Sequence, residues 1–285
     1  MQSKIIRHLT TIFLCLLPFL LGSPLGKHTP YIETNPFWTY VIIWATSSLT
    51  VAAIAWLIAR KFQRNMTNPY LPGYVLFLLL IPALGILGLA VAPDLSMTML
   101  EHPEREHFRY ALLFIALIPF FGFFRLINRP NYLELSTIAR SVLVALFFIA
   151  FLVFLNEFSH HYSYPEALQR WVNEGKAFED FSKNYDTRAG IAEGAIGRLA
   201  QYAFIIFLVI RLYQLRKVLL WAPIVLVFLS LLGMVSSVIM WVTEFHPPQG
   251  LEFLFLLFIP GMPFLFLYWL GIAWLTKFNP PATSV

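Results

Sequence analysis

The segment NEFSHHY, Asn156 to Tyr162, opens the one long polar stretch of this sequence, which continues to Arg198. Long apolar runs flank the stretch on both sides. A helix needs about 20 predominantly apolar residues to cross a hydrocarbon core of roughly 30 Å. We therefore expect residues 157–198 to form a loop outside a membrane, between two membrane-spanning helices.

Composition supports a membrane protein. The chain has 285 residues, of which 59% are hydrophobic and 12% are charged, whereas a soluble domain carries about 25% charged residues. The net charge of +5 comes without a compact Lys/Arg block that would hold a nucleic-acid backbone, so nucleic acid is excluded as a partner. The expected partners are the lipid bilayer and other membrane subunits. The single cysteine, Cys15, allows no internal disulfide and no cysteine-based metal site.

The predicted fold is an all-α bundle of about eight membrane spans, in one domain that covers residues 1–285. Each apolar run is long enough to cross the bilayer as a helix, and none shows the alternation of a barrel strand. The predicted spans are residues 5–22, 38–59, 70–92, 108–126, 138–156, 199–215, 218–242 and 251–276.

The first span resembles a secretory signal sequence, because Lys4 and Arg7 precede a Leu/Phe-rich run. No Ala-x-Ala cleavage site follows it; the chain continues from Gly22 to Lys27 as GSPLGK. We expect an uncleaved membrane anchor. Cleavage, the alternative, would leave the rest of the topology unchanged.

The loops between the spans differ sharply in charge. One set of short loops holds most of the basic residues and, of the acidic residues, only Glu134, whereas the other set holds the remaining acids and six of the seven histidines. Basic loops face the cytoplasm. Both termini are therefore predicted to be cytoplasmic, and the short loops favour a bacterial inner (plasma) membrane. The basic residues of the predicted inner side are Lys4, Arg7, Arg60, Lys61, Arg64, Arg125, Arg129, Arg140, Arg211, Arg216, Lys217 and Lys277.

Within the outer loop, Pro165 to Phe181 carries apolar residues at helical spacing, Trp171 among them. A proline suits the first turn of a helix. We expect an amphipathic helical cap between the fifth and sixth spans, which either lies flat at the membrane surface or covers the end of the bundle. Asn184 to Gly197 is predicted to form a short second helix.

Several predicted spans contain helix-breaking residues. Proline removes a backbone donor, and in a membrane the freed carbonyl must find a donor on a neighbouring helix. Such breaks can line a transporter's substrate site, or they can reflect the general frequency of Gly and Pro in membrane helices. The residues concerned are Pro82, Gly85, Gly88, Pro119, Gly122, Pro260, Gly261 and Pro263.

The residues able to support chemistry lie in three outer segments, at 101–107, 157–161 and 244–246. Carboxylate and imidazole groups together bind zinc, iron or manganese, and such a metal could activate water for hydrolysis. The catalytic candidates are Glu157, His161 and His246, and the candidate ligands of a divalent metal are Glu157, His160, His161, Glu244 and His246. Alternatively, Arg109 or Arg198 neutralises Glu157 or Glu244 in an ion pair.

Three functions are consistent with these features. The first is a non-catalytic membrane protein, either permease-like or a partner in a larger membrane assembly. The second is an enzyme of the extracytoplasmic face, with or without a metal, that acts on lipid or a lipid-linked substrate. The third is a sensor of pH or of a ligand that uses the outer histidines, since histidine titrates near neutral pH.

Overall fold

The structure is a computed structural model, and it describes residues 2–26, 37–60, 97–129, 132–185, 187–259 and 261–277. Its described residues are helical apart from short turns and connecting loops, and they contain no strand. The all-α class predicted from the sequence is therefore confirmed for this part of the chain. The predicted span 70–92 lies outside the described residues.

The helices follow the apolar runs of the sequence. They are α1 (Gln2–Gly26), α2 (Phe37–Arg60), α4 (Met97–Glu101), α5 (Pro103–Ile127), α6 (Thr137–Tyr162), α7 (Tyr164–Asn173), the 3-10 turn η3 (Phe178–Asp180), α8 (Phe181–Tyr185), α9 (Arg188–Gln214), α10 (Trp221–Val242), α11 (Leu254–Phe258) and α12 (Gly261–Leu275).

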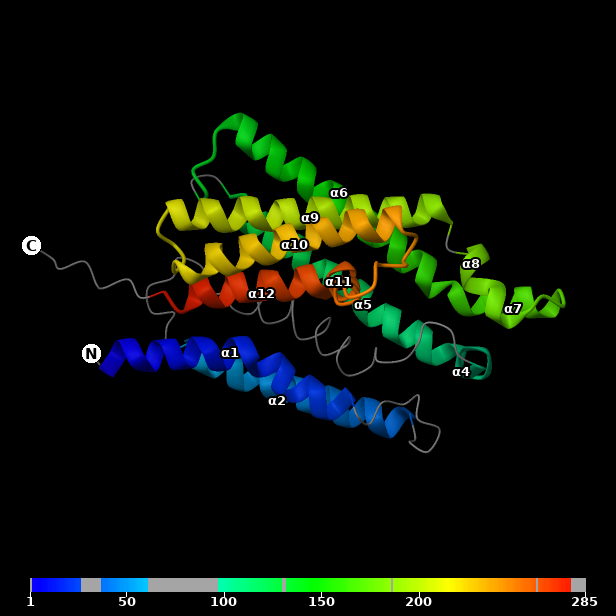
Figure 1. Ribbon diagram of the computed structural model, residues 1–285. Helices are drawn as coiled ribbons and strands as arrows, with labels where there is room; N and C mark the ends of the chain where they lie inside the picture. Colours follow the sequence, from blue (N-terminus) through cyan, green and yellow to red (C-terminus); the bar gives the residue numbers. More distant parts are fainter. Residues whose placement is uncertain are drawn as a thin grey trace, which may run out of the picture.

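Helix α9 forms the centre of the bundle. It packs most extensively against α10 and α6 and also contacts α12, while α1 lies against α12 and α2 (Figure 1). Phenylalanine rings pack together between α5, α6, α9 and α12; the centroids of Phe124, on α5, and Phe147, on α6, are 3.9 Å apart. Within the described residues, α6, α9 and α10 are the helices both long and apolar enough to cross a membrane.

The surface of α10 shows why a lipid environment suits this bundle. Large apolar side chains recur every three or four residues along its exposed face, so they form one continuous stripe. A soluble monomer rarely exposes such an apolar surface, whereas lipid chains solvate it favourably. The exposed residues of the stripe are Ile224, Phe228, Leu231, Val235, Val238 and Val242.

Among the described residues, the loops of the two sets lie at opposite ends of the bundle. Nζ of Lys217 donates to the carbonyl of Tyr132 at 2.6 Å, and Nε of Arg211 donates to the carbonyl of Leu133 at 2.7 Å. These contacts join the α5–α6 and α9–α10 loops at the end where α1 begins and α12 finishes, whereas α4, α7 and α8 lie at the other end (Figure 1). The separation predicted from charge is therefore present, and the end that faces the cytoplasm stays a prediction.

The polar segment 157–198 is much more helical than the sequence suggested. Helix α6 continues to Tyr162, and α9 begins at Arg188, well before the predicted span at 199. The separate short helix expected over 184–197 was wrong, because these residues belong mostly to α9. Thr187 caps the start of α9 by accepting a hydrogen bond from the N–H of Gly190 at 3.2 Å, so the helix starts at this cap and not at the predicted edge of the membrane.

The amphipathic segment after α6 contains α7, which contacts α4, α5 and α6. Helix α7 buries Tyr164 and Leu168, which pack with Met99 of α4 and Phe181 of α8 in a small apolar cluster separate from the main core. Trp171 is partly buried beside this cluster, and its Nε1 donates to the carbonyl of Ala177 at 2.8 Å.

The last predicted span, 251–276, is not one continuous helix. It is divided into α11 and α12, and Ile259 between them has an extended backbone with φ −59° and ψ 132°. The next residue in the sequence is Pro260, and a residue before proline is pushed out of the helical region. The predicted helix breakers therefore produce a real interruption inside the bundle.

Candidate functional site

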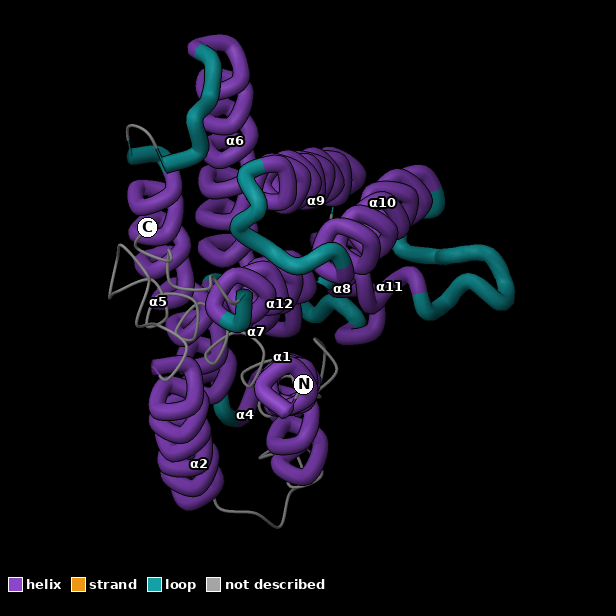
Figure 2. Tube along the Cα trace, turned by 90° about the vertical axis from the view of Figure 1, so that its left-hand side faces the viewer, coloured by secondary structure: helices purple, strands orange, loops and turns teal. Residues whose placement is uncertain are grey.

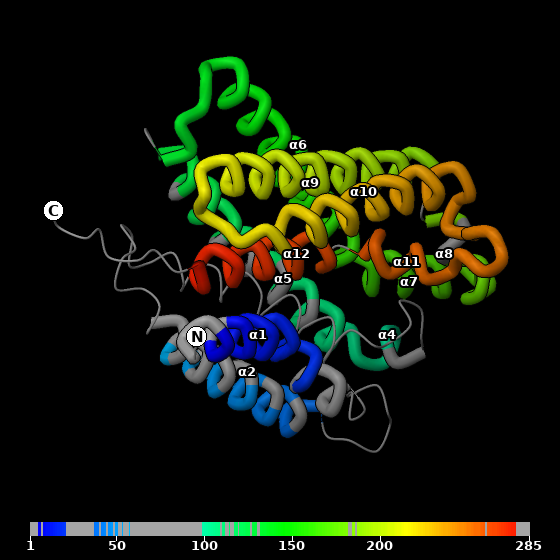
Figure 3. Tube along the Cα trace, turned by 60° about the vertical axis from the view of Figure 1, so that its left-hand side comes forward, coloured from blue at the N-terminus to red at the C-terminus, as the bar shows by residue number. Residues whose placement is uncertain are grey.

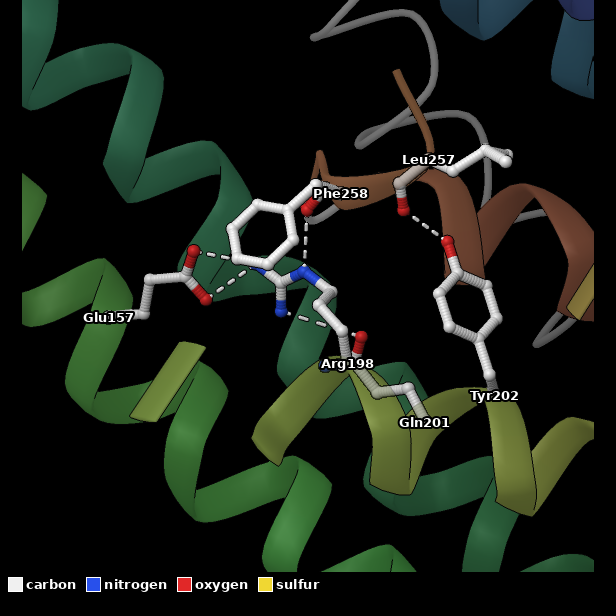
Figure 4. A network of polar contacts seen from close by, with 6 residues as sticks. All are labelled: Glu157, Arg198, Gln201, Tyr202, Leu257 and Phe258. Carbon is white, nitrogen blue, oxygen red and sulfur yellow. Dashed lines mark hydrogen bonds and ion pairs between the residues drawn. The ribbon is translucent and has the colours of Figure 1, made fainter. Parts of the chain in front are cut away.

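A charge pair between α6 and α9 lies in the interior of the bundle. Arg198 is fully buried, with 0% of its side chain exposed, and Glu157 is 15% exposed. Nη2 of Arg198 lies 2.6 Å from both carboxylate oxygens of Glu157 (Figure 4). The guanidinium also lies over the Phe154 ring, 5.0 Å from its centroid. The ion pair predicted as the alternative role of Glu157 is thus confirmed.

The remaining donors of Arg198 tie the pair to the helix break. Nε donates to the carbonyl of Phe258 at 2.8 Å, and Nη1 donates to Oε1 of Gln201 at 3.4 Å. Phe258 is the last residue of α11, where the carbonyls have no partner within the helix. Arg198 therefore neutralises a carboxylate from one helix and satisfies a carbonyl released by another.

Two further side chains satisfy carbonyls of α11. The hydroxyl of Tyr202, on α9, donates to the carbonyl of Leu257, and Oγ of Ser236, on α10, donates to the carbonyl of Leu254 at 2.6 Å (Figure 4). An unpaired carbonyl is costly where no water can reach it. Arg198 and Tyr202 together give donors to the carbonyls at the end of α11, inside an apolar bundle.

The same arrangement recurs between α1 and α12. Pro18 of α1 has no N–H to offer Leu14, four residues earlier. The hydroxyl of Tyr268, on α12, donates to that carbonyl at 2.6 Å, and Nε1 of Trp269 donates to the carbonyl of Cys15 at 3.1 Å. Aromatic polar groups thus fix α1 against α12 at its proline.

Close helix contact around the charge pair depends on glycine. A Cβ placed on Gly233 of α10 would lie 2.3 Å from Cζ of Tyr202, and one placed on Gly197 of α9 would lie 2.4 Å from Cγ1 of Val153. Neither distance is tolerable. These two glycines therefore allow α10 and α6 to approach α9 closely enough for its polar side chains to reach α11.

The histidines at the end of α6 lie against aromatic rings. His160 stacks on Tyr185 with centroids 4.5 Å apart, and His161 stacks on Tyr110 at 5.2 Å. Nearby, Nε2 of His107 lies 2.8 Å from Oε1 of Glu166, which joins α5 to α7. These histidines connect α5, α6, α7 and α8 to one another.

Glu244 and His246 lie in the exposed loop after α10. Oε1 of Glu244 is 3.5 Å from Nε of Arg188, and both side chains are largely exposed, so this ion pair adds little stability. Nδ1 of His246 is 2.7 Å from the carbonyl of Glu244. The contacts of these two residues are thus made within their own loop and with the start of α9.

The proposed metal ligands are not assembled into one group. Among the residues that the structure describes, no three His, Cys, Asp or Glu side chains are placed to hold a metal ion. The metal set Glu157, His160, His161, Glu244 and His246, and the catalytic use of three of these residues, stay predictions from the sequence.

Sequence reasoning named Arg198 as an ion-pair partner but missed Gln201 and Tyr202, and it missed that the polar side chains of α9 reach the helix break. Arg198, Gln201 and Tyr202 are spaced three and four residues apart, which places them on one face of a helix. That spacing was a usable signal. It was overlooked because the predicted span began at residue 199, which divided Arg198 from its two neighbours.

No protein-family model, curated protein or solved structure matches this chain. Its function is therefore argued from its own residues.

Proposed function

We propose that this chain is a non-catalytic, multi-pass protein of the plasma membrane that acts as a partner of other membrane subunits. The observation that carries this proposal is the position of Glu157. Both of its carboxylate oxygens are bonded to Arg198, which in turn bonds the end of α11. The strongest catalytic candidate of the sequence thus holds helices together.

The membrane topology is part of the proposal. Eight spans with both termini in the cytoplasm would place the loop at 128–136 inside and α7 outside, as an extracytoplasmic cap. The positions of these loops at opposite ends of the bundle and the apolar stripe of α10 support this arrangement.

Single-cysteine labelling tests the orientation. Cys15 is the sole cysteine, so a Cys15→Ser background permits one new cysteine at a time. A membrane-impermeant maleimide should label Asn173→Cys in intact cells and should label Arg129→Cys only after the membrane is permeabilised; both native residues are exposed. The opposite pattern would invert the topology.

A second experiment tests the partner role. Membranes are dissolved with a copolymer that excises native discs without detergent, and the purified discs are analysed for a second protein subunit. We expect a subunit that is present in a fixed ratio to the chain and is lost when Phe228→Ala and Val235→Ala remove part of the α10 stripe. Discs that hold this chain alone would refute the partner role and leave the topology intact.

A permease-like role is the second candidate, favoured by the interrupted helix α11–α12. Transporters use such interruptions to bind substrates, because the released carbonyls are available. Here two of those carbonyls, at Leu257 and Phe258, already accept hydrogen bonds from α9. A permease would have to exchange these bonds for bonds to a substrate. Uptake of a solute by vesicles containing the chain would favour this candidate.

The enzyme and sensor hypotheses predict different experimental results. An enzyme that uses His161 and His246 should lose activity or bound metal in His161→Ala and His246→Ala while remaining folded. A sensor should change its structure when histidines such as His107, which faces Glu166, are protonated. Both remain open alternatives from the sequence.

A further inference from the structure

A groove of about 770 Å³ lies between α6, α9 and α10, away from the charge pair. Helix α6 diverges from α9 towards its own N-terminal end, where the loop before it returns to the end of α9 (Figures 1 and 3). Helix α9 lies between α6 and α10 (Figure 2), and residues of all three helices line the groove. The volume is in the range of pockets that bind small molecules, about 300–1,000 Å³.

Polar and apolar residues are separated along the groove. At the end near the loops its lining includes Glu134, Ser136, Arg211 and Gln214, whereas the deeper part is apolar. The apolar residues are Leu135, Ala139, Leu146, Ala203, Ile206, Phe207, Ile210, Leu231 and Met234. An occupant must therefore be polar at one end and hydrocarbon along the rest.

The length of the groove matches one leaflet of a membrane. Along α9, the groove extends over the eleven residues from Gln214 to Ala203, which is about 16 Å of helix at 1.5 Å per residue. Leu146 on α6 and Leu231 on α10 lie about ten residues into their helices from the same end. Half of a roughly 30 Å hydrocarbon core is about 15 Å, so the groove extends from the polar boundary to the middle of the bilayer.

The polar end of the groove holds one positive and one negative side chain, Arg211 and Glu134. They complement the negative phosphate and the positive ammonium group of a phospholipid headgroup. Arg211 donates from Nε to the Leu133 carbonyl at 2.7 Å, from Nη2 to the Glu134 carbonyl, and from Nη1 to Oε1 of Gln214 at 3.2 Å. Three of its five donors are used in this way, and two remain. Guanidinium is well suited to phosphate, and the Glu134 carboxylate is suited to an ammonium group.

A second cation lies near this end. Burial lowers the pKa of the Lys217 ammonium and the nearby Arg211 lowers it further, while Glu134 acts in the opposite direction. Lys217 is held by the Tyr132 carbonyl at 2.6 Å and lies over the Tyr132 ring. Basic side chains between helix ends are a recognised setting for phospholipid headgroups.

We propose that this groove binds one phospholipid, with its phosphate at Arg211 and an acyl chain running between α6, α9 and α10 towards Ala203. This inference rests on the membrane location in the proposed function and is independent of the role as an assembly partner. Cell fractionation tests that location separately: a chain absent from the membrane fraction would refute the proposed function itself.

The test measures photocrosslinking of a defined lipid to the groove, in the native protein and in variants whose side chains fill the groove. The protein is reconstituted in nanodiscs that contain a trace of phosphatidylethanolamine with a photoreactive diazirine in its acyl chain, and the crosslinked peptides are mapped. Native protein should be crosslinked at Ile206, Phe207 or Met234. Ala203→Phe should lower this labelling at least tenfold, and Ala145→Phe, an exposed alanine of α6 outside the groove, should leave it unchanged.

Two further arms complete the design. A photoreactive diacylglycerol, which lacks the phosphate, should label the groove at least tenfold less than the phospholipid does. If Ala203→Phe does not fold, Met234→Trp blocks the groove from α10 and should give the same loss. Equal labelling of native protein and a folded groove-filling variant would overturn the proposal, as would equal labelling by the two lipids or occupation of the groove by a crosslinked protein subunit.

Discussion

The charge pair between Glu157 and Arg198 predicts a large and non-additive loss of stability. Arg198 has 0% of its side chain exposed. Glu157→Gln would leave its guanidinium charged, with no carboxylate beside it. Removing one member of a buried ion pair typically costs about 3–5 kcal/mol, because the other charge is left uncompensated. We expect Glu157→Gln to lower the free energy of unfolding by that amount.

Removal of the arginine should cost a similar amount for a partly different reason. Arg198→Met removes the charge and keeps an apolar side chain, but it leaves Glu157 without its cation and the Phe258 carbonyl without its donor. Arg198→Lys keeps the charge and loses the planar set of donors that reaches Glu157, Gln201 and Phe258 at once. We expect Arg198→Lys to be destabilised by about 1.5–3 kcal/mol, the range for hydrogen bonds of charged groups.

The double variant decides whether the two residues act as a unit. In Glu157→Gln/Arg198→Met neither charge is left alone, so the loss should be smaller than the sum of the two single losses by about 2 kcal/mol or more, within the usual range for coupled residues. Unfolding by SDS in mixed micelles, followed by tryptophan fluorescence, measures the free energy of unfolding of the native protein and of each variant. Single losses that add within 0.5 kcal/mol, or a Glu157→Gln loss below 1 kcal/mol, would refute the reasoning.

Three further predictions use the same unfolding assay. Tyr202→Phe should lose about 1–3 kcal/mol, because the Leu257 carbonyl loses its donor in an apolar interior; an unchanged midpoint would mean that this hydrogen bond is unimportant. Gly233→Ala should lose about 1–3 kcal/mol, since its Cβ would lie 2.3 Å from the Tyr202 ring, whereas Gly190→Ala, with its nearest atom 3.6 Å away, should be neutral or stabilising. Glu244→Gly should gain about 1 kcal/mol, because Glu244 has φ +50° at the end of α10, a conformation that glycine adopts without strain; a loss of bound metal in this variant would support the metal hypothesis instead.

Hydrophobic pattern was sufficient to predict most helices but not their ends. The predicted span 138–156 lies within α6, yet α6 continues to Tyr162 because neither polarity nor the membrane edge ends a helix. The start of α9 is set by the hydroxyl of Thr187 and not by the apolar boundary at Leu199. Placing a loop wherever the sequence becomes polar was therefore the main error.

The ion pair could be predicted, but its burial could not. Glu157 and Arg198 are the polar ends of two predicted spans, so opposite charge alone suggested that they meet. The complete burial of Arg198 depends on α11, which supplies a carbonyl acceptor and the Phe258 ring, 5.6 Å from the guanidinium. That contribution comes from sixty residues further along the chain, and no local pattern reveals it.

The helix break and the buried cation each supply the hydrogen-bonding partners that the other lacks. A guanidinium inside an apolar bundle needs acceptors, and an interrupted helix has carbonyls that need donors. The carbonyl end of α11 also carries partial negative charge, which favours a cation beside it. If Arg198 were placed against a continuous helix, the Phe258 carbonyl would be used within that helix, and the guanidinium would lose an acceptor. The break between α11 and α12 is therefore the reason that Arg198 can be buried there, and Arg198 is in turn a reason that the break is stable inside the bundle.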